Sequence, residues 1–226
     1  ELSSKWTIQG DAKYNRGYLR YLDPTYLGAE GKIEDIFNQN ESYTSISTLY
    51  RPSQNLSISL ASDITSATMF SERESFATPT RITSQSAIAA KLISEQFIST
   101  ASLLYTQTFE STKIGNPANN KSKLSPHLSL SFKPFQDINL RIRSFYKNSF
   151  RIPTFNDLYY PLVGQRNLKP ESANQFNVGA TYSTPSTNKS LFTTLTLDAY
   201  HNRINDKIIA YPSGNLHQWT MMNLGE

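Results

Sequence analysis

The residues that could carry out chemistry are few and scattered. The sequence contains three histidines, His127, His201 and His217, and no cysteine. None of these histidines has a second ligand at a useful spacing, so we interpret each as a hydrogen-bonding residue and predict no metal site. The chain has no glycine-rich phosphate loop and no Ser-His-Asp arrangement, and Glu72 and Glu74 fall in a predicted loop. The sequence therefore predicts a protein that is not an enzyme and needs no cofactor.

A second group of candidate residues carries charge on one side of predicted strands. Arg141, Arg143 and Lys147 alternate with Leu140, Ile142 and Tyr146, and Asp198 alternates with Leu195 and Leu197. Successive strand residues point to opposite faces, so these four charged side chains share the face opposite the apolar one. That face can attract an anionic ligand. The net charge of +4 is spread along the chain without a basic run, so no nucleic-acid partner is expected.

The elements that position these residues are strands with alternating polarity. The sequence has 29 Ser, 21 Thr and 13 Tyr, a composition that suits strands better than helices. Soluble strands are mostly about 5–6 residues long, whereas about 9–11 residues cross a bilayer at a tilt. The alternation predicts about ten long antiparallel strands, near residues 3–18, 42–51, 55–70, 81–92, 96–109, 122–133, 138–150, 173–184, 190–205 and 216–226.

The predicted connectors alternate between short and long. The short ones cover 51–55, 92–96, 133–137 and 184–189, and the long ones 19–41, 71–80, 110–121, 151–172 and 206–215. Outer-membrane barrels have short turns on one side and longer loops on the other. No apolar run is long enough for a transmembrane helix, and the first residues do not form a signal peptide. The sequence thus predicts an all-β, antiparallel transmembrane β-barrel.

Two motifs border the predicted loop 151–172. The first runs Phe150-Arg151-Ile152-Pro153 and is followed by Asn156-Asp157-Leu158-Tyr159. The second ends in Asn167-Leu168-Lys169-Pro170-Glu171. Pro153 restricts the residue before it to extended conformations and removes a ladder donor, which indicates the end of regular pairing.

These motifs resemble the conserved boxes of TonB-dependent outer-membrane receptors. The resemblance implies an energised uptake transporter in the outer membrane of a Gram-negative bacterium, with a 22-strand, plugged barrel. Residues 1–226 then form a partial barrel, and we expect the plug domain and the remaining strands to lie outside this sequence. The implied partners are outer-membrane lipid, the plug, the inner-membrane energy-coupling protein TonB and a small-molecule ligand. The residues that carry the resemblance are Phe150, Arg151, Pro153, Asn156, Leu158, Tyr159, Asn167, Leu168, Lys169, Pro170 and Glu171.

The topology places four candidate ligand-binding side chains in or beside extracellular loops: Tyr159, Tyr160, Arg166 and Trp219. An aromatic girdle at the membrane interface is the alternative interpretation of these aromatic residues, and the one we favour. The lumen-facing residues are Arg141, Arg143, Lys147 and Asp198. The three basic ones can attract an anionic ligand such as a ferric siderophore, or dock acidic groups of the plug, which we favour. Residues 154–164 contain no histidine, in contrast to the haem-uptake branch of the family.

Three functional hypotheses follow from the sequence. The first is energised uptake of a scarce nutrient, such as a siderophore or cobalamin, through a TonB-dependent receptor. The second is a passive porin or a structural outer-membrane barrel. The third is a soluble β-rich binding domain. A plug domain upstream of this sequence would support the first hypothesis, and a complete chain of ten strands would support the second. Solubility as a folded monomer without detergent would support the third.

Overall fold

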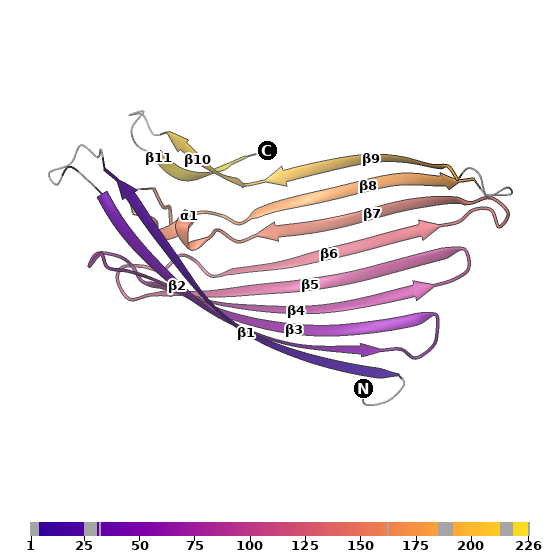
Figure 1. Ribbon diagram of the computed structural model, residues 1–226, viewed down its shortest axis with the longest axis horizontal. Coiled ribbons are helices and arrows are strands. Elements are labelled where there is room, and N and C mark those ends of the chain that lie inside the picture. The colour runs from indigo at the N-terminus through magenta and orange to yellow at the C-terminus, as the bar shows by residue number, and fades with distance from the viewer. Residues whose placement is uncertain are drawn as a thin grey trace.

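The chain folds into one long antiparallel sheet with a short hairpin beside it, as the computed structural model in Figure 1 shows. The structure describes residues 5–24, 31, 33–161, 163–184, 192–212 and 219–225. Nine strands pair in sequence order, and the final two form a separate hairpin. The strands are β1 (Trp6–Asp23), β2 (Ile33–Tyr50), β3 (Leu56–Ser71), β4 (Pro79–Ile93), β5 (Phe97–Thr112), β6 (Lys121–Phe132), β7 (Leu140–Arg151), β8 (Glu171–Ser183), β9 (Thr194–Asn205), β10 (Lys207–Pro212) and β11 (Trp219–Leu224).

The predicted all-β antiparallel class is confirmed, but the prediction of the first long connector is wrong. Residues 19–41 were expected to form a loop, whereas β1 and β2 are 18 residues each and pair from Trp6↔Tyr50 to Asp23↔Ile33. In this upper part, polar residues such as Arg20, Asn38 and Asn40 occupy the face that is apolar lower down. The two-residue alternation is lost there, so the sequence pattern did not reveal the strands.

The predicted loop 206–215 is also wrong, because β10 occupies residues 207–212 and pairs with β11. Asp206 separates β9 from β10 with a φ of 53°, in the left-handed region that Asp tolerates better than most residues. The contrast in connector length is weaker than predicted as well. The short-side connector 133–139 and the long-side connector 72–78 are seven residues each.

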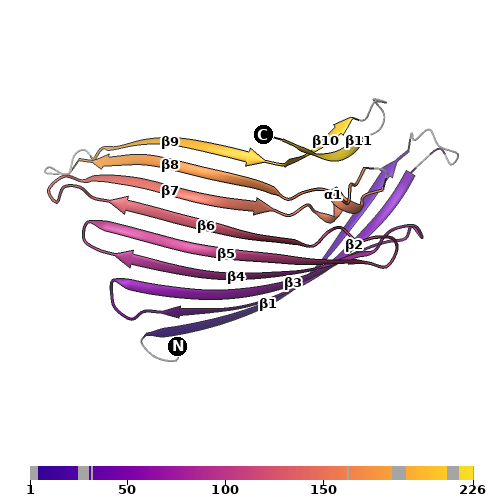
Figure 2. The ribbon, with the colours of Figure 1, turned by 180° about the vertical axis from the view of Figure 1, so that it is seen from behind.

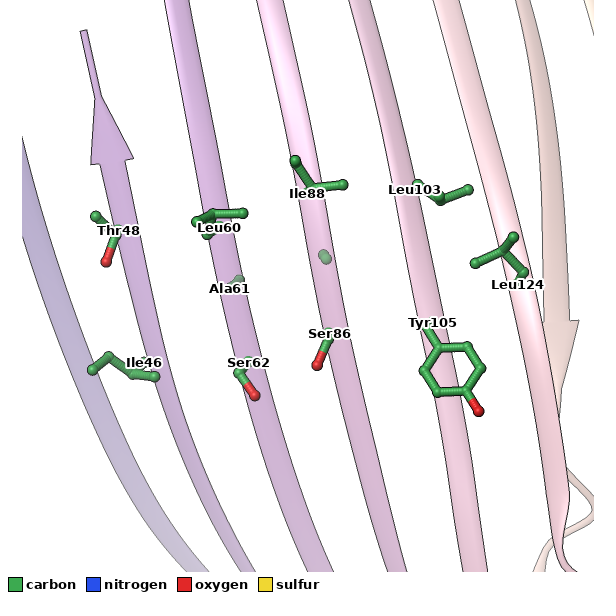
Figure 3. A pocket seen from close by; sticks show the side chains of 11 residues that line it. Ile46, Thr48, Leu60, Ala61, Ser62, Ser86, Ile88, Leu103, Tyr105 and Leu124 are labelled. Carbon is green, nitrogen blue, oxygen red and sulfur yellow. The ribbon is translucent and has the colours of Figure 1, made fainter.

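The two faces of the sheet differ in chemistry, as the alternation predicts. One face, which we call the apolar face, carries the row Leu60, Ile88 and Leu103, whose members pair side by side across β3, β4 and β5. Small Ser62 and Ser86 leave a shallow apolar hollow between these residues and Tyr105 (Figure 3). The opposite face, which we call the polar face, carries Arg141, Arg143 and Lys147 of β7 and Asp198 of β9.

The buried core lies at one end of the sheet and not along its middle. A five-residue helix, α1 (Phe155–Tyr159), and the β10–β11 hairpin lie at this end in both views of the molecule (Figures 1 and 2). The core residues come from β2, β3 and β10, from three connectors and from α1: Phe37, Ala67, Met69, Phe76, Ala77, Ala118, Phe155, Leu158, Tyr159, Leu168 and Ile208. Those from the sheet, such as Phe37 and Ala67, share the polar face. No helix in the described part of the chain is long and apolar enough to cross a membrane.

Candidate functional site

The segment between the two motifs begins with a capped turn of helix. The Thr154 hydroxyl accepts a hydrogen bond from the Asp157 backbone N–H at 3.2 Å, and the Asp157 carboxylate accepts one from the Thr154 N–H at 2.8 Å. This reciprocal capping box satisfies two backbone donors at the start of α1. Pro153 is buried just before the cap and fixes the direction in which the chain leaves β7. The segment predicted as a loop therefore contains a short helix. The prediction missed it because the capping signal Thr-x-x-Asp was not read from the sequence.

The apolar side chains of α1 pack against the polar face of the sheet and its connectors. Phe155, Leu158 and Tyr159 are all buried. The neighbouring Tyr160 ring lies 5.3 Å from that of Phe37, centroid to centroid, and Phe37 packs edge-on against Phe76 at 5.5 Å. Tyr159 and Tyr160 thus lie on the polar side of the sheet. The aromatic-girdle interpretation is wrong for these two residues, because a girdle would place them on the apolar face.

Polar contacts fix the Tyr159 ring within this core. Its hydroxyl accepts a hydrogen bond from the Ala118 backbone N–H at 2.8 Å. The Arg166 guanidinium lies 5.5 Å from the centre of the ring and donates to the Asn116 carbonyl at 2.7 Å. Burial raises the pKa of Tyr159, so the hydroxyl stays protonated at neutral pH. Tyr159 and Arg166 therefore join the motif segment to the β5–β6 connector.

Gly164 allows the motif segment to fold back on α1. Its backbone N–H donates to the Tyr160 carbonyl at 2.8 Å. A Cβ at this position would lie 2.6 Å from the Tyr160 backbone nitrogen, too close for any side chain. The tight return places Leu168 in the core, where 2% of it is exposed.

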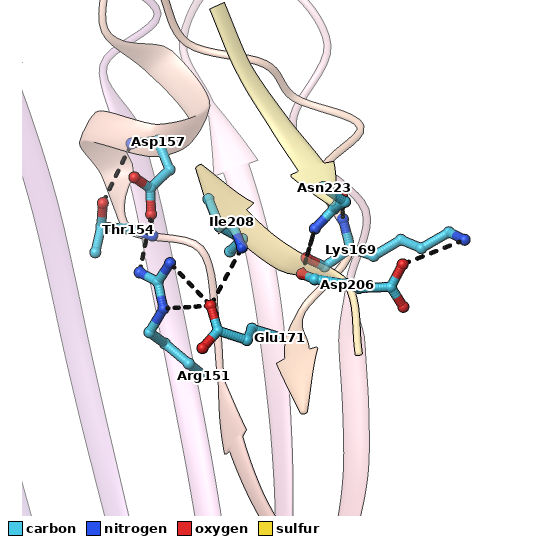
Figure 4. Close-up of polar contacts among 8 residues, drawn as sticks. All are labelled: Arg151, Thr154, Asp157, Lys169, Glu171, Asp206, Ile208 and Asn223. Atoms are coloured by element: carbon cyan, nitrogen blue, oxygen red, sulfur yellow. Dashed lines mark hydrogen bonds and ion pairs between the residues drawn. The ribbon is translucent and has the colours of Figure 1, made fainter. Parts of the chain in front are cut away.

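Arg151 connects the two motifs, as Figure 4 shows. Its guanidinium lies 3.4 Å from the Asp157 carboxylate and 3.5 Å from that of Glu171. The same Glu171 carboxylate accepts a hydrogen bond from the Ile208 backbone N–H at 3.2 Å. The end of β7, the start of β8, α1 and the β10–β11 hairpin therefore meet at one ion-pair network.

The second motif holds the hairpin through its backbone. The Asn223 side chain accepts from the Lys169 N–H at 2.8 Å and donates to the Lys169 carbonyl at 2.9 Å and the Asp206 carbonyl at 2.8 Å (Figure 4). The Lys169 ammonium lies 3.8 Å from the Asp206 carboxylate. Asn167 is exposed, whereas Pro170 is half-buried beside the network. Sequence reasoning missed Asn223, which has no local signal because it acts across 54 residues.

The four candidate ligand-binding side chains do not form one cluster. Tyr159 and Arg166 lie together, and the partly buried Tyr160 packs against the same core. Only 6% of Tyr159 is exposed, so little of its surface can meet a ligand in this conformation. Trp219 is 51% exposed at the start of β11 and pairs with Pro212. Ligand binding by these residues stays a prediction, and the accessible members are Arg166, Tyr160 and Trp219.

The four residues predicted to face the lumen share the polar face. Lys147 pairs with His127 and with Gln175 across the sheet. Arg141 donates to the Ser131 hydroxyl at 3.1 Å, and Arg143 forms an ion pair with Asp198 at 3.2 Å. His201 lies on the apolar face, 6.4 Å from the Phe176 ring, and His217 lies outside the described residues.

A buried ion pair under α1 was also missed from the sequence. The Arg81 and Glu110 side chains pair at 2.5 Å, and the Arg81 guanidinium lies 5.0 Å from the centre of the Phe155 ring. The Glu110 side chain is almost completely buried. The two residues are 29 positions apart and become neighbours only through the β4–β5 register, so nothing in the local sequence indicates their pairing.

Comparison with protein families shows which family has this arrangement of strands and motifs. The model described as TonB dependent receptor-like, beta-barrel, matches residues 1–226. The chain belongs to this family. Members of the TonB-dependent receptor family are transporters and receptors, not enzymes, and lie in the outer membrane of Gram-negative bacteria.

Individual relatives agree with the family assignment. The vitamin B12 transporter BtuB of Vibrio vulnificus (strain YJ016) is 40% identical over 75 residues, which are 33% of this chain and 11% of that protein. Among solved structures, the copper transporter OprC matches 99% of this chain and 39% of its own, with a TM-score of 0.74 and 11% identity. The FrpB iron transporter of Neisseria meningitidis (F5-1 variant, apoprotein form) matches 96% of this chain and 37% of its own, with a TM-score of 0.69 and 15% identity. The chain thus spans well under half of these proteins.

Proposed function

We propose that this TonB-dependent receptor barrel segment forms part of the wall of an outer-membrane transporter that imports a scarce nutrient, such as a siderophore or cobalamin, by energised uptake. The plug, the energy-coupling protein TonB, outer-membrane lipid and a small-molecule ligand are its proposed partners. Capture by the loops and rearrangement of the plug would move the ligand without covalent chemistry.

The contrast between the two faces of the sheet carries the proposal. The apolar face runs across all nine strands, and large side chains on it are widely exposed, such as Leu60 at 54% and Leu197 at 75%. An apolar surface of this extent requires a non-aqueous environment, which lipid supplies. The opposite face holds Arg141, Arg143, Lys147 and Asp198 and the folded motif segment, as expected for a wall that surrounds a polar lumen.

The folded motif segment supports a receptor in preference to a passive porin. A porin needs an open polar channel, whereas here α1 and the connectors build a buried core on the polar face. A soluble binding domain is disfavoured by the exposed apolar face.

Growth of a deletion strain tests the proposal. The gene that encodes this chain is deleted, and growth is measured on limiting iron chelates, haem, cobalamin or glycans as the defined source. We expect a growth defect on one class of nutrient. The intact gene should restore growth on that nutrient, but not in a strain that also lacks the energy-coupling protein. Equal growth with and without that protein would support a passive barrel instead.

A further inference from the structure

The ladder between β6 and β7 ends before the two strands do. Its last pair is His127↔Lys147, so residues 121–126 of β6 and 148–151 of β7 lie beyond it. Pro126 is the first residue of β6 past this pair, and a proline has no N–H to offer a neighbouring strand. Both segments keep their other neighbour, β5 or β8. The sheet therefore has a seam between β6 and β7 at the end that carries α1.

A cavity of about 390 Å³ lies in this seam. Ser122, Phe150 and Ser172 line it, and the strand register assigns all three to the apolar face. Lys121 and Lys123 line it as well, and the register assigns them to the polar face. A continuous ladder would keep the two sets of side chains apart. The cavity therefore passes through the seam, and the two lysines can be reached from the apolar side.

The seam lies at one border of the apolar surface. On β6 the apolar row ends with Leu124, which is 51% exposed, and the next residue of that row toward the α1 end is Ser122. Strand edges without a partner do not occur where they face the hydrocarbon of a bilayer, because their backbone groups would lose their hydrogen bonds. The unpaired edges of the seam therefore place it at the level of the lipid headgroups.

The charge of the cavity is positive. Three lysines and one aspartate line it, which leaves two net positive charges: Lys121, Lys123, Lys169 and Asp206. The Lys169 ammonium lies 3.8 Å from the Asp206 carboxylate, and 73% of the Lys169 side chain is exposed (Figure 4). In the described part of the chain, Lys121 and Lys123 form no ion pair. The carboxylate nearest to Lys121 belongs to Glu110 and is already paired with a guanidinium.

The lysines approach the cavity from two sides. Lys121 and Lys123 are two residues apart on β6, a spacing of roughly 7 Å along a strand. Lys169 comes from the other side of the seam, just before β8. Ammonium groups bind phosphate as point charges, and a phosphate group has several acceptor oxygens to share among them. The headgroup level of a membrane is also where phosphate groups of lipids lie.

We propose that the seam binds the phosphorylated headgroup of an outer-membrane lipid, with Lys123 and Lys169 on either side of the phosphate. The acyl chains of this lipid would lie along the apolar face next to Leu124. The inference goes beyond the proposed uptake function, because the ligand is a lipid of the surrounding membrane and not the transported nutrient.

Lipid binding by the purified intact receptor tests the seam. Its dissociation constant for diphosphoryl lipid A is measured in detergent, with lipid A that lacks both phosphates and with inorganic phosphate as comparison ligands. The double variant Lys123→Gln/Lys169→Gln removes two charges from the cavity. Lys113→Gln is the matched control, because this exposed lysine lies at the same end of the sheet, against the Phe70 ring and outside the cavity. Lys123→Arg/Lys169→Arg keeps both charges.

We expect Lys123→Gln/Lys169→Gln to raise the dissociation constant for diphosphoryl lipid A at least roughly tenfold, the worth of one lost charged contact. Lys113→Gln and the double arginine variant should bind as the unsubstituted receptor does. Equal weakening by Lys113→Gln, equal binding of the lipid without phosphates, or binding of inorganic phosphate alone would overturn the lipid site. Energised uptake is measured on the same variants. Absent lipid binding with intact uptake overturns the seam site and leaves the transport function standing.

Discussion

Arg143 on β7 and Asp198 on β9 form an ion pair at 3.2 Å across the strand that lies between them. At this row of the sheet β8 contributes Gly179, which pairs with both residues in the register. A Cβ on Gly179 would clash with the Asp198 carboxylate and lie 3.0 Å from the Leu197 carbonyl. The glycine therefore lets two strands that are not neighbours interact directly on the polar face.

Replacing this glycine should remove the pair by steric exclusion. Exposed ion pairs contribute about 0–1 kcal/mol, so Asp198→Asn should cost no more than that in the free energy of unfolding. Gly179→Val should cost more, because the backbone of β9 must also move. Urea unfolding of the receptor in detergent measures both variants and the double variant. Simple addition of the two effects would show that Gly179 does not act through Asp198.

The Tyr159 hydroxyl should stabilise the core through one hydrogen bond. In Tyr159→Phe the Ala118 N–H loses its acceptor, and a buried unpaired donor costs about 1–3 kcal/mol. Tyr160→Phe is the matched control, because no hydrogen bond to its hydroxyl occurs among the described residues. Thermal or urea unfolding should show that Tyr159→Phe is less stable than Tyr160→Phe. Equal stability of both would contradict the role assigned to this hydrogen bond.

Asn223 should hold the β10–β11 hairpin against the second motif. Asn223→Ala removes three hydrogen bonds, each with a net contribution of about 0.5–1.5 kcal/mol. Hydrogen exchange should become faster in residues 207–212 and stay unchanged in residues 140–151 of β7. Thr220→Ala, in the same strand, supplies a control with a similar loss of side-chain volume. Uniformly faster exchange would instead indicate that the whole sheet is destabilised.

Removal of one partner of the buried pair under α1 should lower the free energy of unfolding more than replacement of both partners by apolar residues. Glu110→Gln leaves the Arg81 guanidinium without its counter-charge, and such losses cost about 3–5 kcal/mol. The double variant Arg81→Met/Glu110→Leu removes both charges and should recover most of the lost stability. Stability of the folded receptor against urea is the measurement. A double variant less stable than Glu110→Gln would contradict this account of the pair.

The sequence predicted the sheet well where its two faces meet different environments. Alternation located the lower parts of the strands, such as residues 55–70 against the observed Leu56–Ser71. It failed in the upper part of β1 and β2, where Arg20 and Asn40 interrupt the apolar face and both faces mix polar and apolar residues. The β10 strand was missed for a related reason, since six residues that follow a kink at Asp206 show too little periodicity.

The site could be predicted in part only. The motifs located the segment that leaves the sheet, and Pro153 indicated correctly where β7 gives way to other structure. The partners of that segment could not be found, because Tyr159 meets Ala118 and Glu171 meets Ile208 over separations of 41 and 37 residues. Such contacts depend on strand register and on the fold of the connectors, which single residues do not reveal.

The initial rate of nutrient uptake, with and without a protonophore, tests the central claim most directly. Cells that carry the intact gene are supplied with the radiolabelled nutrient on which the deletion strain fails to grow. The account predicts that the protonophore lowers uptake to the rate of the deletion strain, because the import step draws its energy from the inner membrane. Uptake that continues unchanged in the presence of the protonophore would contradict it and would identify a passive barrel.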